Sequence, residues 1–141
     1  DRLGLSDRIC ERLDPNVLLP AVAQGTLAIE MREGESEWSE SIRELDDPHV
    51  ALTASGERSF LHSLEGDCSV PLAALCEKLD GNRARLRGLV CSIDGSRVIQ
   101  SECEVEASLA AVSEAGAELA REVLAKGGGE ILEGLRAEGL A

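Results

Sequence analysis

The sequence predicts an α+β fold in which a three-stranded antiparallel sheet packs against helices. Two Asp-Gly pairs, Asp80-Gly81 and Asp94-Gly95, are typical of hairpin turns, and they divide one region into three apolar runs. From Ser108 onward the apolar residues follow a helical period instead. Hydrophobic residues make up 43% of the 141 residues, which is enough for one domain with a buried core. These patterns together indicate an α+β domain from about residue 47 onward.

The first 45 residues are predicted to form a separate piece. Residues 26–31 alternate between larger apolar side chains and small or polar ones, and this period of two predicts a strand with one buried face. The next apolar residues are spaced i, i+4 and i+7, which predicts a helix with one apolar stripe. The two sets are Leu27, Ile29 and Met31 for the strand, and Trp38, Ile42 and Leu45 for the helix.

A second helix is predicted to begin after Asp47, whose carboxylate is a good N-cap, with Pro48 in the first helical position. Gly56 is a weak point in the middle of this helix, and Gly66 is a natural terminator. We expect its buried side to consist of Ala54, Leu61 and Leu64, with Phe60 beside them.

Three strands and two further helices are predicted after residue 69. The first run extends from Val70-Pro71 to Leu79, the second lies between the two turns, and the third extends from Val98 to Val105. Three consecutive glycines then separate a long amphipathic helix from a short final one. The apolar residues are Leu86, Leu89, Val90 and Ile93 in the second strand, Leu109, Val112, Leu119 and Val123 in the long helix, and Ile131, Leu132 and Leu135 in the final helix.

The net charge of −13 argues against binding to nucleic acid or to anionic membrane surfaces, because both attract Lys and Arg. Base stacking needs aromatic side chains, and the chain has one Trp, one Phe and no Tyr. No apolar run approaches the roughly 20 residues that span a bilayer. We therefore expect neither nucleic acid nor a membrane among the partners.

The five cysteines are odd in number and include no CxxC pair, so the sequence predicts no zinc or other metal site. No secretory signal precedes them, and we expect reduced thiols. This pattern indicates a cytoplasmic protein, or one of the plastid stroma if the source is a photosynthetic eukaryote.

Three stretches, taken together, resemble hydroxymethylbilane synthase (porphobilinogen deaminase). Residues 19–25 read LPAVAQG and lead into the predicted strand, as in the family. Residues 57–71 contain ERSFL and LEGDCSVP, which look like the family's cofactor-attachment segment and form a specific signal. Residues 88–96, which contain GLV and DGS, are similar to the second and third strands of its last domain.

The resemblance implies that the chain is the C-terminal part of a three-domain enzyme. Residues 1–25 would be the tail of the second domain, 26–46 would return to the first, and 47–141 would be the cofactor-attachment domain. The family joins four porphobilinogen units and releases ammonia in haem or chlorophyll biosynthesis. Its catalytic aspartate and most substrate-binding arginines would lie upstream of Asp1, so we expect no catalytic residue here and no turnover by this chain alone.

The resemblance also implies partners and a cofactor. The partners would be porphobilinogen, the growing polypyrrole chain and the N-terminal domains of the same enzyme, which would be a monomer when complete. The cofactor would be a dipyrromethane held on Cys68 as a thioether. Cys68 follows a predicted helix end and is flanked by Glu65 and Asp67, so we expect a raised pKa, which suits a permanent anchor rather than a recycling nucleophile. Asp67 stands where the family usually has Gly.

Four further residues match family positions near the cofactor. Arg2 falls on an arginine that contacts pyrrole carboxylates, for which a guanidinium offers a bidentate fork. Ala23, Gln24 and Gly25 match a loop whose backbone lies near the cofactor. The alternatives are a solvated terminal arginine for Arg2 and an ordinary turn before a strand for the other three.

Two other functions remain open at this point. A non-catalytic α+β interaction module could keep the fold without the chemistry. A thiol-dependent hydrolase could pair Cys68 with His62, although no orienting partner is apparent, and we expect both His62 and His49 to be helix-surface residues.

Overall fold

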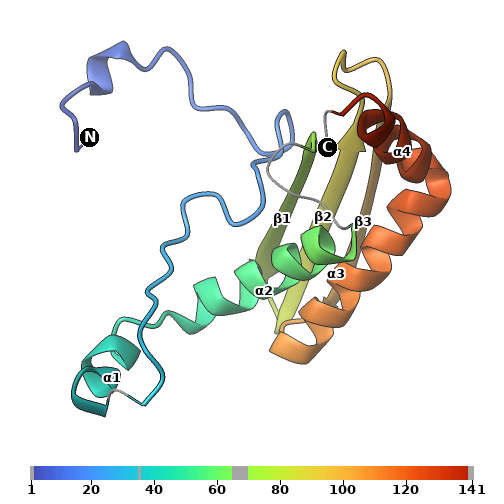
Figure 1. The fold of residues 1–141 in the computed structure, drawn as a ribbon. Coiled ribbons are helices and arrows are strands. Elements are labelled where there is room, and N and C mark those ends of the chain that lie inside the picture. Colours follow the sequence, from blue (N-terminus) through green and yellow to red (C-terminus); the bar gives the residue numbers. More distant parts are fainter. Residues whose placement is uncertain (1, 35, 65–69, 140–141) are drawn as a thin grey trace.

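The structure is a computed structural model that describes residues 2–34, 36–64 and 70–139. Its N-terminal part is mostly irregular and its C-terminal part is an α+β domain (Figure 1). Among these residues no helix combines the length and apolarity needed to cross a membrane. The elements are α1 Ser36–Arg43, α2 Pro48–Ser63, β1 Leu72–Leu79, β2 Arg83–Cys91, β3 Val98–Glu106, α3 Leu109–Val123 and α4 Gly129–Ala137, with short helical turns at Ser6–Arg8 and Leu124–Gly128.

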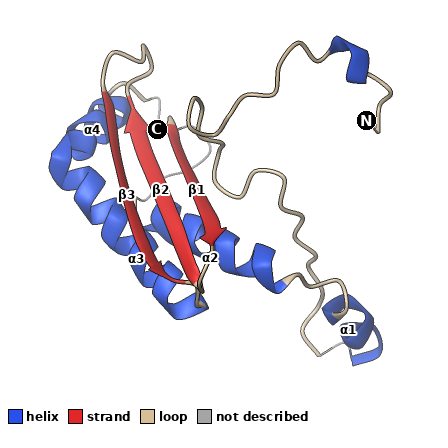
Figure 2. Cartoon of the chain, turned by 180° about the vertical axis from the view of Figure 1, so that it is seen from behind, coloured by secondary structure: helices blue, strands red, loops and turns tan. Residues whose placement is uncertain are grey.

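The three strands form one antiparallel sheet in the order β1-β2-β3, as the turn signals predict. Gly81 and Asn82 make the first turn with φ angles of 68° and 59°, which glycine and asparagine adopt more readily than other residues. Helices α2, α3 and α4 cover one face of the sheet, and Figure 2 shows the other face without a helix. The α+β prediction is confirmed, except that β2 ends at Cys91 and leaves Ile93 exposed in the following turn.

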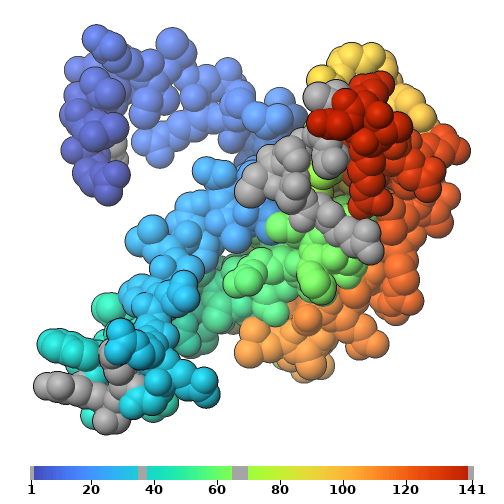
Figure 3. Space-filling model, viewed as in Figure 1, coloured from blue at the N-terminus to red at the C-terminus, as the bar shows by residue number. Residues whose placement is uncertain are grey.

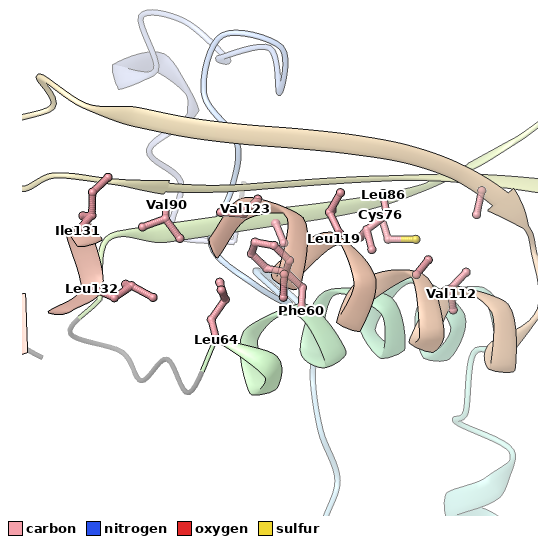
Figure 4. Packing of buried hydrophobic residues seen from close by; sticks show 14 of the residues in the cluster. Phe60, Leu64, Cys76, Leu86, Val90, Val112, Leu119, Val123, Ile131 and Leu132 are labelled. Carbon is pink, nitrogen blue, oxygen red and sulfur yellow. The ribbon is translucent and has the colours of Figure 1, made fainter. Parts of the chain in front are cut away.

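The core lies between this sheet and its helices, and Phe60 of α2 is at its centre (Figure 4). Phe60 is fully buried, and its ring lies against the backbone of β2 at Gly88, where an added Cβ would be 2.5 Å from two ring carbons. Leu86 and Val90, on either side of Gly88, face the same core. Phe60, the one Phe of the chain, thus fills the space that a side chain at position 88 would occupy.

Helix α2 begins as predicted but buries a different side. The carboxylate of Asp47 accepts hydrogen bonds from the backbone N–H of His49 at 2.8 Å and Val50 at 3.2 Å, which confirms the N-cap. The buried residues are Gly56, Glu57, Phe60 and Leu64, whereas Ala54 and Leu61 are only half-buried, so the predicted face was wrong in part.

The reason for the different buried face is a close approach of α2 to α3. A Cβ at Gly56 would be 3.2 Å from the backbone oxygen of Val112, and a Cβ at Gly116 would meet the backbone oxygen of Gly56. Glycine is costly inside a helix, but here it allows two helix backbones to pack closely. Gly56 is thus a packing position and not a weak point.

The three glycines after α3 bend the chain without a long loop. Gly127 has a φ of 112°, which L residues rarely adopt, and it lies in the turn Leu124–Gly128 between the two helices. Helix α4 then returns Ile131, Leu132 and Leu135 to the core, as predicted. The predicted face of α3 is also correct at Val112, Leu119 and Val123, while Leu109 is exposed.

The predicted strand at residues 26–31 is not formed. The backbone there is irregular, and Leu27 and Ile29 are 92% and 56% exposed. A strand needs a neighbour to satisfy its backbone groups, and the described part of the chain brings none to this segment. Helix α1 is formed, but Trp38 on its apolar stripe is exposed and Leu45 lies beyond its end.

Candidate functional site

The predicted anchor, Cys68, lies outside the described residues, together with its neighbours Glu65 and Asp67. On its N-terminal side, α2 ends at Ser63 and the following Leu64 is buried in the core. On its C-terminal side, Val70 packs against the same core. The chain on both sides of 65–69 is therefore held by the C-terminal domain.

Three of the predicted site residues lie together in one tight loop. The backbone N–H of Gln24 donates to the oxygen of Ala21, and that of Thr26 donates to the oxygen of Ala23, both at 3.0 Å. Ala23 and Gly25 have φ angles of 54° and 83°, in the left-handed region. Gln24 and Gly25 are exposed, and the Gly25 N–H donates no hydrogen bond within the described ranges.

This loop is docked onto the C-terminal domain by Glu57 of α2. One carboxylate oxygen of Glu57 accepts from the N–H of Ala23 at 2.7 Å, and the other accepts from the N–H of Cys76 in β1 at 2.9 Å. Glu57 is 6% exposed. Burial raises its pKa, while the two backbone hydrogen bonds act in the opposite direction because they favour the charged carboxylate.

A second charged side chain holds the chain a few residues earlier. The guanidinium of Arg87 in β2 donates to the side-chain oxygen of Asn16 at 2.8 Å and to Glu77 of β1 at 2.8 Å. Arg85 donates to the same Glu77 oxygen at 3.0 Å. Asp14 accepts from the Asn16 backbone and side chain at 2.7 Å, so the turn that presents Asn16 is itself held. We call residues 14–26 the docked segment.

A broad groove of about 1380 Å³ lies between the docked segment and α2. Loop residues including Gln24 and Gly25 form one wall, and α2 with part of β1 forms the other. Arg58 of α2 and Lys78 of β1 supply its cationic side chains, and Asp46, Asp47, Glu57 and Glu77 supply carboxylates. The groove is therefore polar and of mixed charge.

The N-terminal end of the chain does not approach this groove. Figures 1 and 3 show it projecting from the body of the molecule, and Arg2 there is exposed. The structure thus brings together Ala23, Gln24 and Gly25 but does not bring Arg2 to them. His49 and His62 are both exposed on α2, as predicted.

Glu57 and Arg87 were not predicted as site residues from the sequence. Glu57 follows Gly56 and precedes the core residue Phe60 by three positions, which places a carboxylate on a buried helical face. Arg87 lies between Leu86 and Gly88 in a strand, where alternation directs it to the opposite face of the sheet. The first pattern is a detectable signal, since a buried charge needs a partner, but neither pattern identifies that partner.

Cys76, on the core-facing side of β1, is a buried thiol of low expected reactivity. Burial, reinforced by the nearby charge of Glu57, raises the pKa of Cys76 to about 12. We predict that iodoacetamide at pH 8 modifies the exposed Cys10 at least about 100-fold faster than Cys76, because so little of the latter is thiolate. Peptide mass mapping at timed intervals measures both rates, and comparable rates would show that β1 opens readily.

Two family models match this chain, one over its N-terminal part and the other over its C-terminal domain. The porphobilinogen deaminase dipyromethane cofactor binding domain matches residues 1–40, which include most of the N-terminal piece and the docked segment. The porphobilinogen deaminase C-terminal domain matches residues 51–125, more than half of the chain. This chain belongs to the porphobilinogen deaminase family. Within this family, the contact of Glu57 with Ala23 joins a segment matched by one domain model to a helix matched by the other.

Individual members of the porphobilinogen deaminase family are similar at about 40% identity. The porphobilinogen deaminase of Synechococcus sp. (strain RCC307) is 43% identical over 101 residues, which cover 72% of this chain and 32% of the relative. That of Oceanobacillus iheyensis is 44% identical over 100 residues, or 70% of this chain and 32% of the relative. The chain thus spans about a third of the length of these curated relatives.

Proposed function

We propose that this chain is the C-terminal part of a hydroxymethylbilane synthase, a transferase that joins four porphobilinogen units and releases ammonia at each step. The observation that carries the proposal is the contact between the two family segments: the loop Ala21–Thr26 docks through Glu57 onto the C-terminal domain. By itself the chain is expected to have no turnover, because the family's catalytic aspartate and most substrate-binding arginines have no counterpart in it.

The proposed division of the chain follows the motifs in its sequence: residues 1–25 end the second domain, 26–46 return to the first, and 47–141 form the third. The exposed alternation of Leu27, Ile29 and Met31 supports this division. In the described part of the chain no strand pairs with this segment, and its apolar side chains lie in solvent; a neighbouring strand of an upstream domain would pair with its backbone and cover these side chains. We expect the complete protein to be a monomer.

Cys68 is proposed to hold the dipyrromethane, which supplies the primer to which pyrrole units are added. A thioether forms once and survives turnover, so the thiol needs no standing negative charge. The loop suits a group that carries carboxylates: the side-chain amide of Gln24 and the N–H of Gly25 are exposed hydrogen-bond donors. Ala23 supports the loop through its contact with Glu57, and Arg2 would add a charge partner from the second domain.

The proposed compartment is the cytoplasm, or the plastid stroma in a photosynthetic eukaryote. The support is the odd cysteine count together with the burial of Cys76 and the partial burial of Cys91 and Cys103. Reduced thiols of this kind are typical of reducing compartments.

The proposal is tested by supplying the part of the enzyme that lies outside the third of the relatives' length spanned by this chain. Residues 1–141 are joined to the N-terminal two-thirds of the Synechococcus relative, and this protein is here called the fusion enzyme. With porphobilinogen, it is expected to release ammonia and form a bilane, whereas the 141-residue chain alone does neither. The intact Synechococcus protein is the matched control. A folded fusion enzyme that forms no bilane would contradict the proposal and favour a non-catalytic interaction module.

A further inference from the structure

The Glu57 side chain links α2 to the docked segment and to β1, and in both contacts its carboxylate accepts from a backbone N–H. Its side chain starts on α2, one oxygen accepts from Ala23 in the docked segment, and the other accepts from Cys76 in β1. Strand β1 is an edge of the sheet that the described residues form, so within them its outward N–H groups have no neighbouring strand. Glu57 thus satisfies an N–H of the sheet edge and a loop N–H with one carboxylate.

The burial of Glu57 depends on these two contacts. A carboxylate that is 6% exposed is costly unless hydrogen bonds compensate for the water it has lost. Within the described ranges no Lys or Arg forms an ion pair with Glu57. The Ala23 and Cys76 N–H groups are therefore its compensation, and release of the loop would leave half of the carboxylate unsatisfied.

The docked segment passes from one face of the sheet to the other around the edge strand β1. Arg87 and Glu77 lie on the open face, where Arg87 holds Asn16, whereas Glu57 lies on the helix-covered face and holds Ala23. Figure 2 shows the chain passing beside β1. Between these two points Val22 packs against the core. The loop is consequently fixed in position relative to β1 and not merely tethered by the chain.

We propose that Glu57 is a positioning residue that fixes the loop Ala21–Thr26, and with it Gln24 and Gly25, against the edge of β1. The functional part of this inference rests on the proposed function, because the loop matters for turnover only if it faces the cofactor. Ala23 has a φ of 54°, which costs energy for a residue with a Cβ, and the hydrogen bond to Glu57 holds that conformation. Loss of this contact is therefore expected to change both the backbone conformation of the loop and its position relative to β1.

The docking is tested in the 141-residue chain by hydrogen exchange of individual amides. In Glu57→Gln the side chain keeps its size, but its carbonyl oxygen replaces only one of the two carboxylate oxygens, and the NH2 group at the other position cannot accept from an N–H. The hydrogen bond from the Cys76 N–H is buried, whereas that from the Ala23 N–H is only partly buried, so we expect the oxygen to stay with Cys76. The Ala23 amide is then expected to exchange at least about tenfold faster, with Cys76 and the β2–β3 amides unchanged. The control is Glu104→Gln, which removes an exposed ion pair with Arg83 and is expected to change neither amide.

Turnover is tested in the fusion enzyme. Glu57→Gln is expected to retain the adduct on Cys68 by mass but to lower kcat per cofactor-loaded molecule by about 10- to 100-fold, since small misplacements near a reacting centre have effects of this size. A merely structural role would lower the amount of loaded enzyme and leave kcat per loaded molecule unchanged. Glu104→Gln is again the control.

The outcomes separate the two proposals. If the unmodified fusion enzyme is inactive, the proposed function fails, while the exchange experiment still decides the docking. If the fusion enzyme is active and Glu57→Gln has the same kcat per loaded molecule, the positioning role is overturned. Should Glu57→Gln fail to fold, the wild-type chain decides: an Ala23 amide that exchanges as fast as an unprotected one, while α2 stays protected, also overturns it.

Discussion

Replacing Cys68 with alanine in the fusion enzyme is expected to abolish the covalent dipyrromethane and to lower bilane formation on the order of 100-fold or more. The reason is that the proposed thioether would keep the primer in the site through every addition. Without it the primer and each intermediate must bind from solution, and the advantage of an intramolecular reaction is lost. The measurement is the mass of the native protein together with the rate of bilane formation.

The matched control for this variant is Cys10→Ala. Cys10 is exposed and lies far along the chain from the motif, so its replacement is expected to leave the adduct and the rate unchanged. The Cys68→Ala protein is also expected to unfold at the same denaturant concentration as the parent, because the proposed role of Cys68 is to hold the cofactor. Bilane formation at an unchanged rate in Cys68→Ala would remove Cys68 from the mechanism.

Replacing Gly116 with alanine is expected to destabilise the 141-residue chain by about 3 kcal/mol. The added Cβ would meet the backbone oxygen of Gly56 and lie 2.9 Å from the backbone nitrogen of Phe60. Both are main-chain atoms of α2, so the clash cannot be relieved by rotation of a side chain. The helices must separate, and Phe60 must leave its position over Gly88. Urea denaturation measures the change as a lower midpoint.

Gly134→Ala is the control for this packing prediction. Gly134 lies in α4, where an added Cβ meets no atom within 4 Å, so only helix propensity changes. That effect should stabilise the chain by up to about 1 kcal/mol. Equal midpoints for the Gly116 and Gly134 variants would show that α2 and α3 are not in close contact in solution.

Local patterns predicted most of the C-terminal domain correctly. The two Asp-Gly turns, the Asp47 cap and the glycine break at 127–129 all depend on neighbouring residues, and each is present as expected. The strand at 26–31 was predicted by the same kind of pattern and is not formed. Its alternation describes which face would be buried, but a strand also needs a partner, and that partner is not a local property.

The candidate site could be predicted only in part, for a similar reason. The resemblance identified Ala23, Gln24 and Gly25, and the structure brings them together in one loop. What holds that loop is a contact between Ala23 and Glu57, which are 34 positions apart. No period or turn signal encodes such a contact. Gly56 was likewise interpreted as a helix weak point, because its role depends on a second helix that approaches it.

The central claim is that Cys68 carries the primer, and peptide mass spectrometry of the active fusion enzyme tests it most directly. Cleavage after Arg58 and Lys78 gives one peptide that contains both Cys68 and Cys76, so the peptide must be fragmented between them, for example before Pro71. We predict an added mass of two linked pyrrole units on the fragment with Cys68 and an unmodified Cys76. An active enzyme with an unmodified Cys68, or with the adduct on Cys76, would contradict the account.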